Sequence, residues 1–258
     1  MINMTNTRFL LIILTVVLFA SCDVIKQTSS TLMSSAKPLT TEEVAQGLKS
    51  ALAVGTDTAI YRLSKTNGYF LDSAVRIGLP PETSYIIDNV RKVPGLDKHI
   101  DGVILKINRA AEDAALKAAP VFKNAISTMS IEDAWSILNG SNDAATNYLK
   151  EKTYNSLVEL YLPIMQESLN KPLLANISAQ KSWDKMINIW NRFATSFAGK
   201  LLDMKSIDTQ LDSYVTKKAL DGLFSKITLQ EKQIRNDADA RVNDLLQRVF
   251  EKRTQIIR

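Results

Sequence analysis

The stretch that decides the fold runs from Ser130 to Leu169, SIEDAWSILNGSNDAATNYLKEKTYNSLVELYLPIMQESL. It predicts two helices joined by a short polar connection at 139–143. Ser130 and Asp133 have the spacing of a capping box, which marks the start of a helix. Apolar residues then recur every three to four positions on both sides of the connection, as in helices that bury one face. Two helices joined so closely pack against each other or share a third partner, which indicates an all-α fold.

The polar connection also predicts how each helix ends. Gly140 follows the last apolar position of the first helix, where a residue in the left-handed conformation commonly ends a helix. Ser141 or Asn142 is expected to cap the second helix, and Asp143 suits the positive end of its dipole. Pro163 lies further along the second helix, and we expect it to kink or end the helix there.

The same connection is a candidate binding site. Asn139, Asn142 and Asp143 lie beside helix N-terminal amides, a place where a small ligand or a partner loop can be held. The alternative is that these side chains only cap the two helices. The alternative is favoured, because every polar residue in the connection already has a local role.

Residues 1–21 are expected to be an export signal. Arg8 precedes an apolar run from Phe9 to Phe19, which is too short to cross a bilayer, since crossing takes about 20 residues. The following LFASC resembles a bacterial lipobox, in which the cysteine carries the lipid. Cys22 is the only cysteine in the chain, and one unpaired thiol is unusual in an exported protein. Lipidation of Cys22 is therefore expected, in preference to an ordinary cleaved signal with an incidental cysteine.

The segment after the signal is expected to be a tether. Residues 22–38 comprise the lipidated cysteine and a stretch rich in Ser, Thr and Lys, which as a flexible coil spans roughly 20–25 Å. Residues 39–258 then form the folded domain. This organisation predicts a bacterial cell-envelope protein, exported and anchored on the periplasmic side of the inner or outer membrane.

The folded part reads as a single, antiparallel, bundle-like domain of about eight to nine helices. Thr40 and Glu43 form a capping box, and the helix that they start should stop before the turn signal at Asn67. Residues 69–79 are irregular, with at most a trace of β-structure. A further capping box is expected at Thr228, with Glu231 as its partner.

A second set of polar candidates lies on the helix expected at 100–118. Arg109 and Glu112 flank its apolar stripe and could contribute to a binding site. We expect Arg109 to pair with Asp113 at i,i+4 spacing. Glu112 and Asp113 are adjacent on a helix and point in different directions, so an ion pair is favoured over an acid–base pair.

An aromatic stripe follows in the C-terminal part of the chain. Trp183, Trp190 and Phe197 recur at helical spacing among other apolar residues. Such a stripe can line a pocket for an apolar ligand, although more often it is simply part of the core.

Several function classes are excluded or disfavoured by composition. His99 is the only histidine, so no metal site with several His ligands is expected, and Cys22 leaves no second thiol. No glycine-rich phosphate loop occurs, and no cofactor is expected. The formal net charge is +5, but export and the uncharged-to-acidic polar connection argue against nucleic-acid binding.

Three segments resemble an uncharacterised bacterial family, domain of unknown function 4197. They are LTTEEVAQGLKSALAVGTDTAIYRLSKTNGYF from Leu39, IEDAWSILNGSNDAATNYLKEKT from Ile131, and YVTKKALDGLFSKITLQEKQIRNDADARVNDLLQRVF from Tyr214. The resemblance covers about Leu39 to Phe250. It implies a secreted or lipid-anchored helical protein, and it implies no activity or catalytic residues.

Three functions remain, in order of preference. The first is a non-enzymatic envelope protein that binds a partner protein or organises something at the membrane surface. The second is a binding protein for a small apolar or lipid-like ligand, held near Trp183, Trp190 and Phe197. The last is a hydrolase-type enzyme, which would require Asp143 to converge with Arg109 or Glu112 in one cleft.

Overall fold

The computed structural model describes residues 39–90, 96–172, 177–241 and 244–256. The chain divides into two units, Met1–Thr40 and Thr41–Arg258. The expected signal, the lipidated Cys22 and the tether lie outside the described residues and stay predictions. All buried apolar residues that are described lie in the second unit, from Val44 onward, so this unit has a core of its own.

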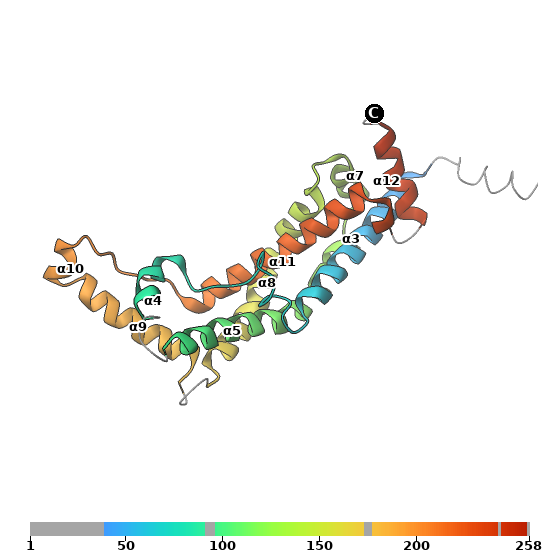
Figure 1. Ribbon diagram of the computed structural model, residues 1–258. Helices are drawn as coiled ribbons and strands as arrows, with labels where there is room; N and C mark the ends of the chain where they lie inside the picture. The colour runs from blue at the N-terminus through green and yellow to red at the C-terminus, as the bar shows by residue number, and fades with distance from the viewer. Residues whose placement is uncertain (1–38, 91–95, 173–176, 242–243, 257–258) are drawn as a thin grey trace, which may run out of the picture. The chain divides into compact units, whose positions relative to one another are not determined.

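The second unit is built from α-helices joined by turns and short 3₁₀ segments (Figure 1). The α-helices, in chain order, are α3 (Thr41–Leu63), α4 (Ser84–Val90), α5 (Leu96–Ala115), α6 (Ala119–Ser127), α7 (Ile131–Asn139), α8 (Ala144–Asn170), α9 (Ala179–Ala194), α10 (Phe197–Leu201), α11 (Leu211–Asn236) and α12 (Asp244–Ile256). The expected all-α class and single multi-helix domain are confirmed. Residues 69–79 form turns and bends, and the described residues contain no strand, only an isolated bridge between Pro172 and Ser178.

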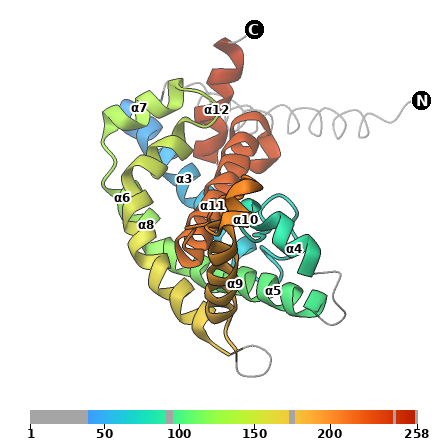
Figure 2. The same cartoon turned by 90° about the vertical axis from the view of Figure 1, so that its left-hand side faces the viewer.

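The core forms where α3, α5, α8 and α11 pack together. The longest of these, α8 and α11, pack along each other, and α11 also packs on α3. In Figure 2, α11 lies near the centre of the unit with α8 beside it. Helices α7 and α12 lie at one end of the unit, and α9 and α10 lie at the opposite end (Figure 1).

Neither of two expected helix boundaries is observed, and the kink expected at Pro163 as the alternative to an end stays a prediction. Pro163 does not end its helix, because α8 continues through it to Asn170. Tyr161 and Met165 on either side of it are fully buried, and burial of this kind outweighs the local cost of proline. Thr228 does not start a helix either. It lies in the middle of α11, where its hydroxyl donates to the Phe224 carbonyl at 3.0 Å.

None of the described helices combines the length and the apolar character that a membrane crossing requires.

Candidate functional site

The junction between α7 and α8 begins as the sequence predicts. The Asp133 amide donates to the Ser130 hydroxyl at 3.0 Å, and the Ser130 amide donates to the Asp133 carboxylate at 3.1 Å. The expected capping box is therefore confirmed. The hydrogen bonds from Ser130 also hold the pKa of Asp133 below its ordinary value.

The polar connection itself differs from the expectation. Gly140 is extended, with φ −77° and ψ −172°, and not left-handed. Neither Ser141 nor Asn142 caps α8: Asp143 precedes the helix without a side-chain cap, and Ser141 instead donates to the Asp143 carboxylate at 2.6 Å. This hydrogen bond lowers the pKa of Asp143. Asn139 donates back to the Trp135 carbonyl at 3.1 Å.

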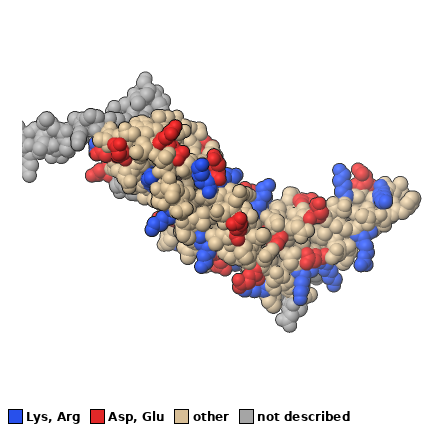
Figure 3. Space-filling view, turned by 180° about the vertical axis from the view of Figure 1, so that it is seen from behind, with Lys and Arg blue, Asp and Glu red and all other residues tan. Residues whose placement is uncertain are grey.

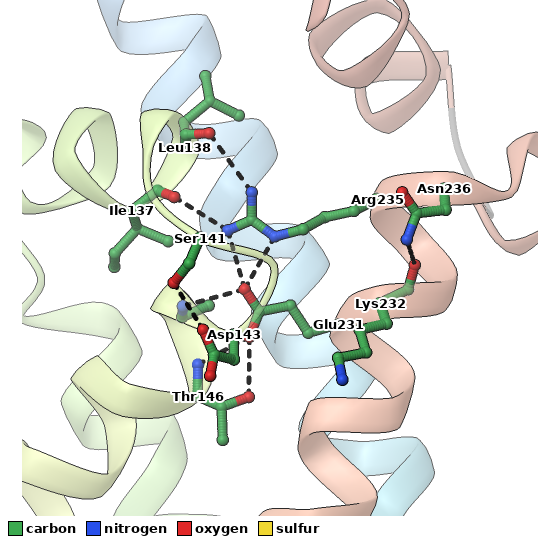
Figure 4. Close-up of polar contacts among 10 residues, drawn as sticks. Ile137, Leu138, Ser141, Asp143, Thr146, Glu231, Lys232, Arg235 and Asn236 are labelled. Carbon is green, nitrogen blue, oxygen red and sulfur yellow. Dashed lines mark hydrogen bonds and ion pairs between the residues drawn. The ribbon is translucent and has the colours of Figure 1, made fainter. Parts of the chain in front are cut away.

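The capping groups come from α11, far along the chain (Figure 4). The Glu231 carboxylate accepts from the amides of Ala145 at 3.0 Å and Thr146 at 2.8 Å, and from the Thr146 hydroxyl at 2.8 Å. Arg235 donates to the Ile137 carbonyl at 2.9 Å. A carboxylate thus meets the positive end of α8 and a guanidinium meets the negative end of α7, as the helix dipoles favour.

This arrangement decides what the α7–α8 junction can do. The amides that could have received a ligand anion are already bonded to Glu231, which is 7% exposed. Asn139 is bonded back onto α7, Asp143 is bonded to Ser141 within the connection, and Asn142 is exposed. The junction is therefore a structural joint. Sequence reasoning missed Glu231 and Arg235, whose i,i+4 spacing was the only signal, because their partners lie about 85 to 98 residues away.

Arg109 and Glu112 also have a structural role. Glu112 is 3% exposed, and its carboxylate accepts from the amides of Tyr69 at 3.1 Å and Phe70 at 3.2 Å. Arg109 pairs with Glu112 and donates to the Asn67 side chain at 2.7 Å. The expected pair between Arg109 and Asp113 is wrong, because the buried Glu112 is the partner.

The two sets of polar candidates hold different parts of the chain. Arg109 and Glu112 fasten the turn at 67–70 to α5, whereas Asn139 bonds back onto α7 and Asp143 bonds within the α7–α8 connection. No hydrogen bond or ion pair between the two sets is found in the described part of the chain. The structure does not assemble them into one constellation.

The aromatic candidates lead to a cavity. A space of about 530 Å³ lies between α4, α5 and α9. Apolar side chains make up most of its lining, and the lining residues are Leu79, Ile86, Ile87, Ile100, Val103, Ile177, Ala179, Lys181, Ser182, Trp183, Lys185, Met186, Ile189 and Trp190. Trp183 and Trp190 therefore line a pocket together. Phe197 does not: it begins α10 and is 85% exposed.

The two tryptophans are held in place from behind the cavity. The indole N–H of Trp183 donates to the Thr209 carbonyl at 3.1 Å, and that of Trp190 donates to the Lys205 carbonyl at 2.9 Å. Asn191 exchanges two hydrogen bonds with the backbone of Ile207, at 2.7 and 2.8 Å. The segment 203–210 is thereby fixed along α9. The indole N–H groups are therefore hydrogen-bonded, while the rings form part of a preformed apolar wall of the cavity.

Charge enters the described part of the cavity lining at two positions. Lys181 and Lys185 lie one turn apart on α9, and both are exposed. Lysine covers apolar surface with its stem and keeps its ammonium in water. The arrangement can hold an apolar body inside and pair an anionic head group outside.

A metal site has no support in the described residues, where no group of three or more His, Cys, Asp or Glu side chains could hold an ion. His99 lies in the first turn of α5, as expected of a residue at a helix start. The structure describes the backbone of His99 but not its side chain.

Fold and site define an all-α protein with a buried polar joint at one end and an apolar cavity toward the other. The chain belongs to a family of proteins of unknown function, DUF4197, whose model matches residues 38–251. The resemblance expected from the sequence is thus confirmed. No curated protein and no solved structure matches the chain.

Proposed function

We propose that this protein binds a small amphipathic molecule, with an apolar body and an anionic head, in the cavity between α4, α5 and α9. The observation that carries the proposal is the cavity. Its volume of about 530 Å³ falls within the roughly 300–1,000 Å³ of small-molecule sites. Its aliphatic and aromatic lining favours an apolar ligand, because binding removes apolar surface from water.

The head group is inferred from the lysines. Lys181 and Lys185 are the charged residues in the part of the lining that the structure describes, and an ammonium attracts a carboxylate or a phosphate. Long-chain fatty acids and lysophospholipids share this chemistry. The chain of such a ligand would lie against Trp183 and Trp190, with its head at the two ammonium groups.

The setting of the protein is part of the proposal. We propose a non-enzymatic protein of a bacterial cell envelope, lipidated at Cys22 and tethered through residues 22–38 on the periplasmic side of a membrane. The export signal and the LFASC sequence support this setting. Cys22→Ser should move the protein from the membrane fraction to the soluble fraction. Retention of the Cys22→Ser protein in the membrane fraction would contradict lipid anchoring.

Ligand binding is tested with protein purified from its envelope. Organic extraction followed by mass spectrometry should recover an amphiphile, and titration of stripped protein with hexadecanoic acid should change the emission of Trp183 and Trp190. Ile86→Trp places a larger ring in the cavity and should weaken the response to the acid. Leu71→Trp adds the same ring at a site that is 70% exposed and outside the lining, so this control should bind normally. If Ile86→Trp protein responds to hexadecanoic acid as strongly as the wild-type protein does, the proposal is wrong.

A protein-interaction role, the first expectation from the sequence, is the second candidate. A groove of about 540 Å³ lies between α3, the turn after it and α11. Its polar lining includes Asn67, Asp72, Gln230 and Gln233, and amide side chains of this kind suit the backbone of a partner loop. Pull-downs from intact envelopes should recover one partner with the wild-type protein and lose it with Gln230→Arg. Repeated recovery of no partner would count against this role.

A further inference from the structure

Large apolar side chains are exposed where α9 ends and α10 follows. Phe193, Phe197, Leu201 and Leu202 expose 47%, 85%, 77% and 66% of their surface, and we call these four residues the α9–α10 tip. Single exposed apolar residues are ordinary, but a group of four within ten positions marks an interaction surface. None of the four lines the cavity.

The tip is a built structure. Ser196 caps α10 by accepting from the Gly199 amide at 3.2 Å, and its hydroxyl donates to the Phe193 carbonyl at 2.6 Å. A side chain at Gly199 would collide with that carbonyl, so the close turn requires glycine. After α10 the Met204 amide returns to the Gly199 carbonyl at 2.9 Å. The turn therefore holds the apolar side chains outward in a defined arrangement.

Cations surround the tip. Arg192, Lys200 and Lys205 are all exposed, and Asp203 is the only acidic residue between 192 and 205. In Figure 3 the end of the molecule that carries α9 and α10, at the right, shows tan atoms at its extremity and Lys and Arg side chains close by, with red acidic atoms beside them at the top. Exposed Phe and Leu beside a basic rim are the composition of segments that rest in a membrane interface.

We infer that the α9–α10 tip docks onto an anionic lipid bilayer, with Phe197 and Leu201 entering the interface and the three cations lying at the head groups. Charge complementarity favours a bilayer as the binding partner, because anionic lipids attract basic residues near the surface. The tip also needs no surface of matching shape in order to bind a bilayer. Docking of the tip on a bilayer does not depend on ligand binding in the cavity. The tip also adjoins the cavity, because Ile189, one turn before Phe193, lines the cavity and is 62% exposed.

The insertion test uses a site-specific fluorophore. Protein that begins at Asp23 has no cysteine, because Cys22 is the only one in the chain, and the core that the structure describes lies within residues 41–258. Phe197→Cys labelled with a nitrobenzoxadiazole dye should shift to the blue with phosphatidylglycerol-containing vesicles, and less with phosphatidylcholine alone. Leu116→Cys, at a position 60% exposed outside the tip, should show no shift.

Vesicle sedimentation with the same Asp23 protein gives the energetic test. Phe197→Glu should lower binding to anionic vesicles at least about tenfold, and Lys200→Glu and Lys205→Glu about fivefold each. Leu116→Glu and the cavity variant Ile86→Trp should bind as wild type, which separates this inference from ligand binding. Circular dichroism and thermal unfolding confirm that each variant is folded.

Three results would overturn docking on lipid. The first is wild-type protein that ignores anionic vesicles, and the second is Phe197→Glu protein that binds them normally. The third is a shift of the dye that follows protein concentration without vesicles, which would assign the tip to a protein partner or a second copy.

Discussion

Glu231 and Arg235 lie one turn apart on α11 and form an ion pair of 2.8 Å whose side chains are 6% and 2% exposed. Each member also binds a helix end of opposite polarity, Glu231 at the start of α8 and Arg235 at the end of α7. One pair on one helix therefore fixes the joint between two others. Its buried charges are satisfied only while all three helices are in place.

Removing one charge of this pair should be costly. Glu231→Gln leaves Arg235 buried without a counter-ion, so the free energy of unfolding should fall by about 3–5 kcal/mol, measured by urea denaturation. The matched control is Glu167→Gln, which breaks another i,i+4 pair of 2.8 Å whose side chains are 71% and 57% exposed. That change should cost far less than Glu231→Gln, because water and salt screen an ion pair between exposed side chains. Equal losses for the two variants would contradict the role assigned to Glu231.

Two fully buried tyrosines should respond differently to loss of their hydroxyl. Burial raises the pKa of both Tyr69 and Tyr161, yet only the Tyr69 hydroxyl has a partner in the described residues, the Ala219 carbonyl at 2.8 Å. Tyr69→Phe should lower the free energy of unfolding by about 1–2 kcal/mol, because the carbonyl loses its donor. Tyr161→Phe should be neutral or stabilising. Thermal and urea unfolding test both, and a marked loss for Tyr161→Phe would show that its hydroxyl is bonded.

Stability should fall in acid partly through Asp72. The hydrogen bond and ion pair from Lys226 hold the pKa of Asp72 below its ordinary 3.8, so the folded state binds fewer protons than the unfolded state. The contribution of Asp72 is complete above that value and is lost as the pH falls through the lowered pKa. Asp72→Asn should therefore reduce stability at pH 6 and flatten its decline between about pH 5 and 2.

Unfolding curves at closely spaced pH values provide the measurement for Asp72. Asp57→Asn, which removes an exposed carboxylate from α3, is the control and should leave the acid decline as it is in wild type. An unchanged decline in Asp72→Asn would show that the ion pair with Lys226 contributes nothing to stability.

Local patterns predicted local structure well. The Ser130–Asp133 capping box and the stop of α3 before Asn67 follow from a few neighbouring residues, and both are observed. Asn67 has φ 72°, a conformation in which asparagine is favoured over most residues. The all-α class follows from the same periodicity.

Long-range partners explain what the sequence could not predict. Glu231 resembled the third residue of a capping box after Thr228, but it caps a different helix from within α11. The Glu112 carboxylate accepts hydrogen bonds from the amides of the 69–70 turn and also pairs with Arg109. Arg109 therefore does not pair with Asp113, which is exposed. Spacing along one helix lists possible neighbours, whereas burial, set by the tertiary fold, selects the partner.

The apolar pocket was partly predictable for the same reason. Helical spacing correctly grouped Trp183 with Trp190, but Phe197 lies beyond the end of α9, and the turn at Ser196 directs it elsewhere. The opposite walls from α4 and α5 carry no feature that distinguishes them from ordinary core residues. The cavity lies between α9 and the walls from α4 and α5. The tertiary fold sets the separation of these helices, so the sequence pattern could not predict the cavity.

The lysines of the cavity give the sharpest prediction about its ligand. Lys181→Glu with Lys185→Glu should weaken binding of hexadecanoic acid at least about tenfold, because two attractive charges become repulsive. Binding of the neutral hexadecanol should stay within about twofold, since the apolar lining is unchanged. Titration of tryptophan emission measures both ligands. Lys150→Glu with Lys152→Glu, two lysines of α8 outside the lining, makes the same change in net charge and should leave both affinities unaltered. Parallel losses for acid and alcohol would show that the lysines shape the cavity and do not recognise an anionic head group.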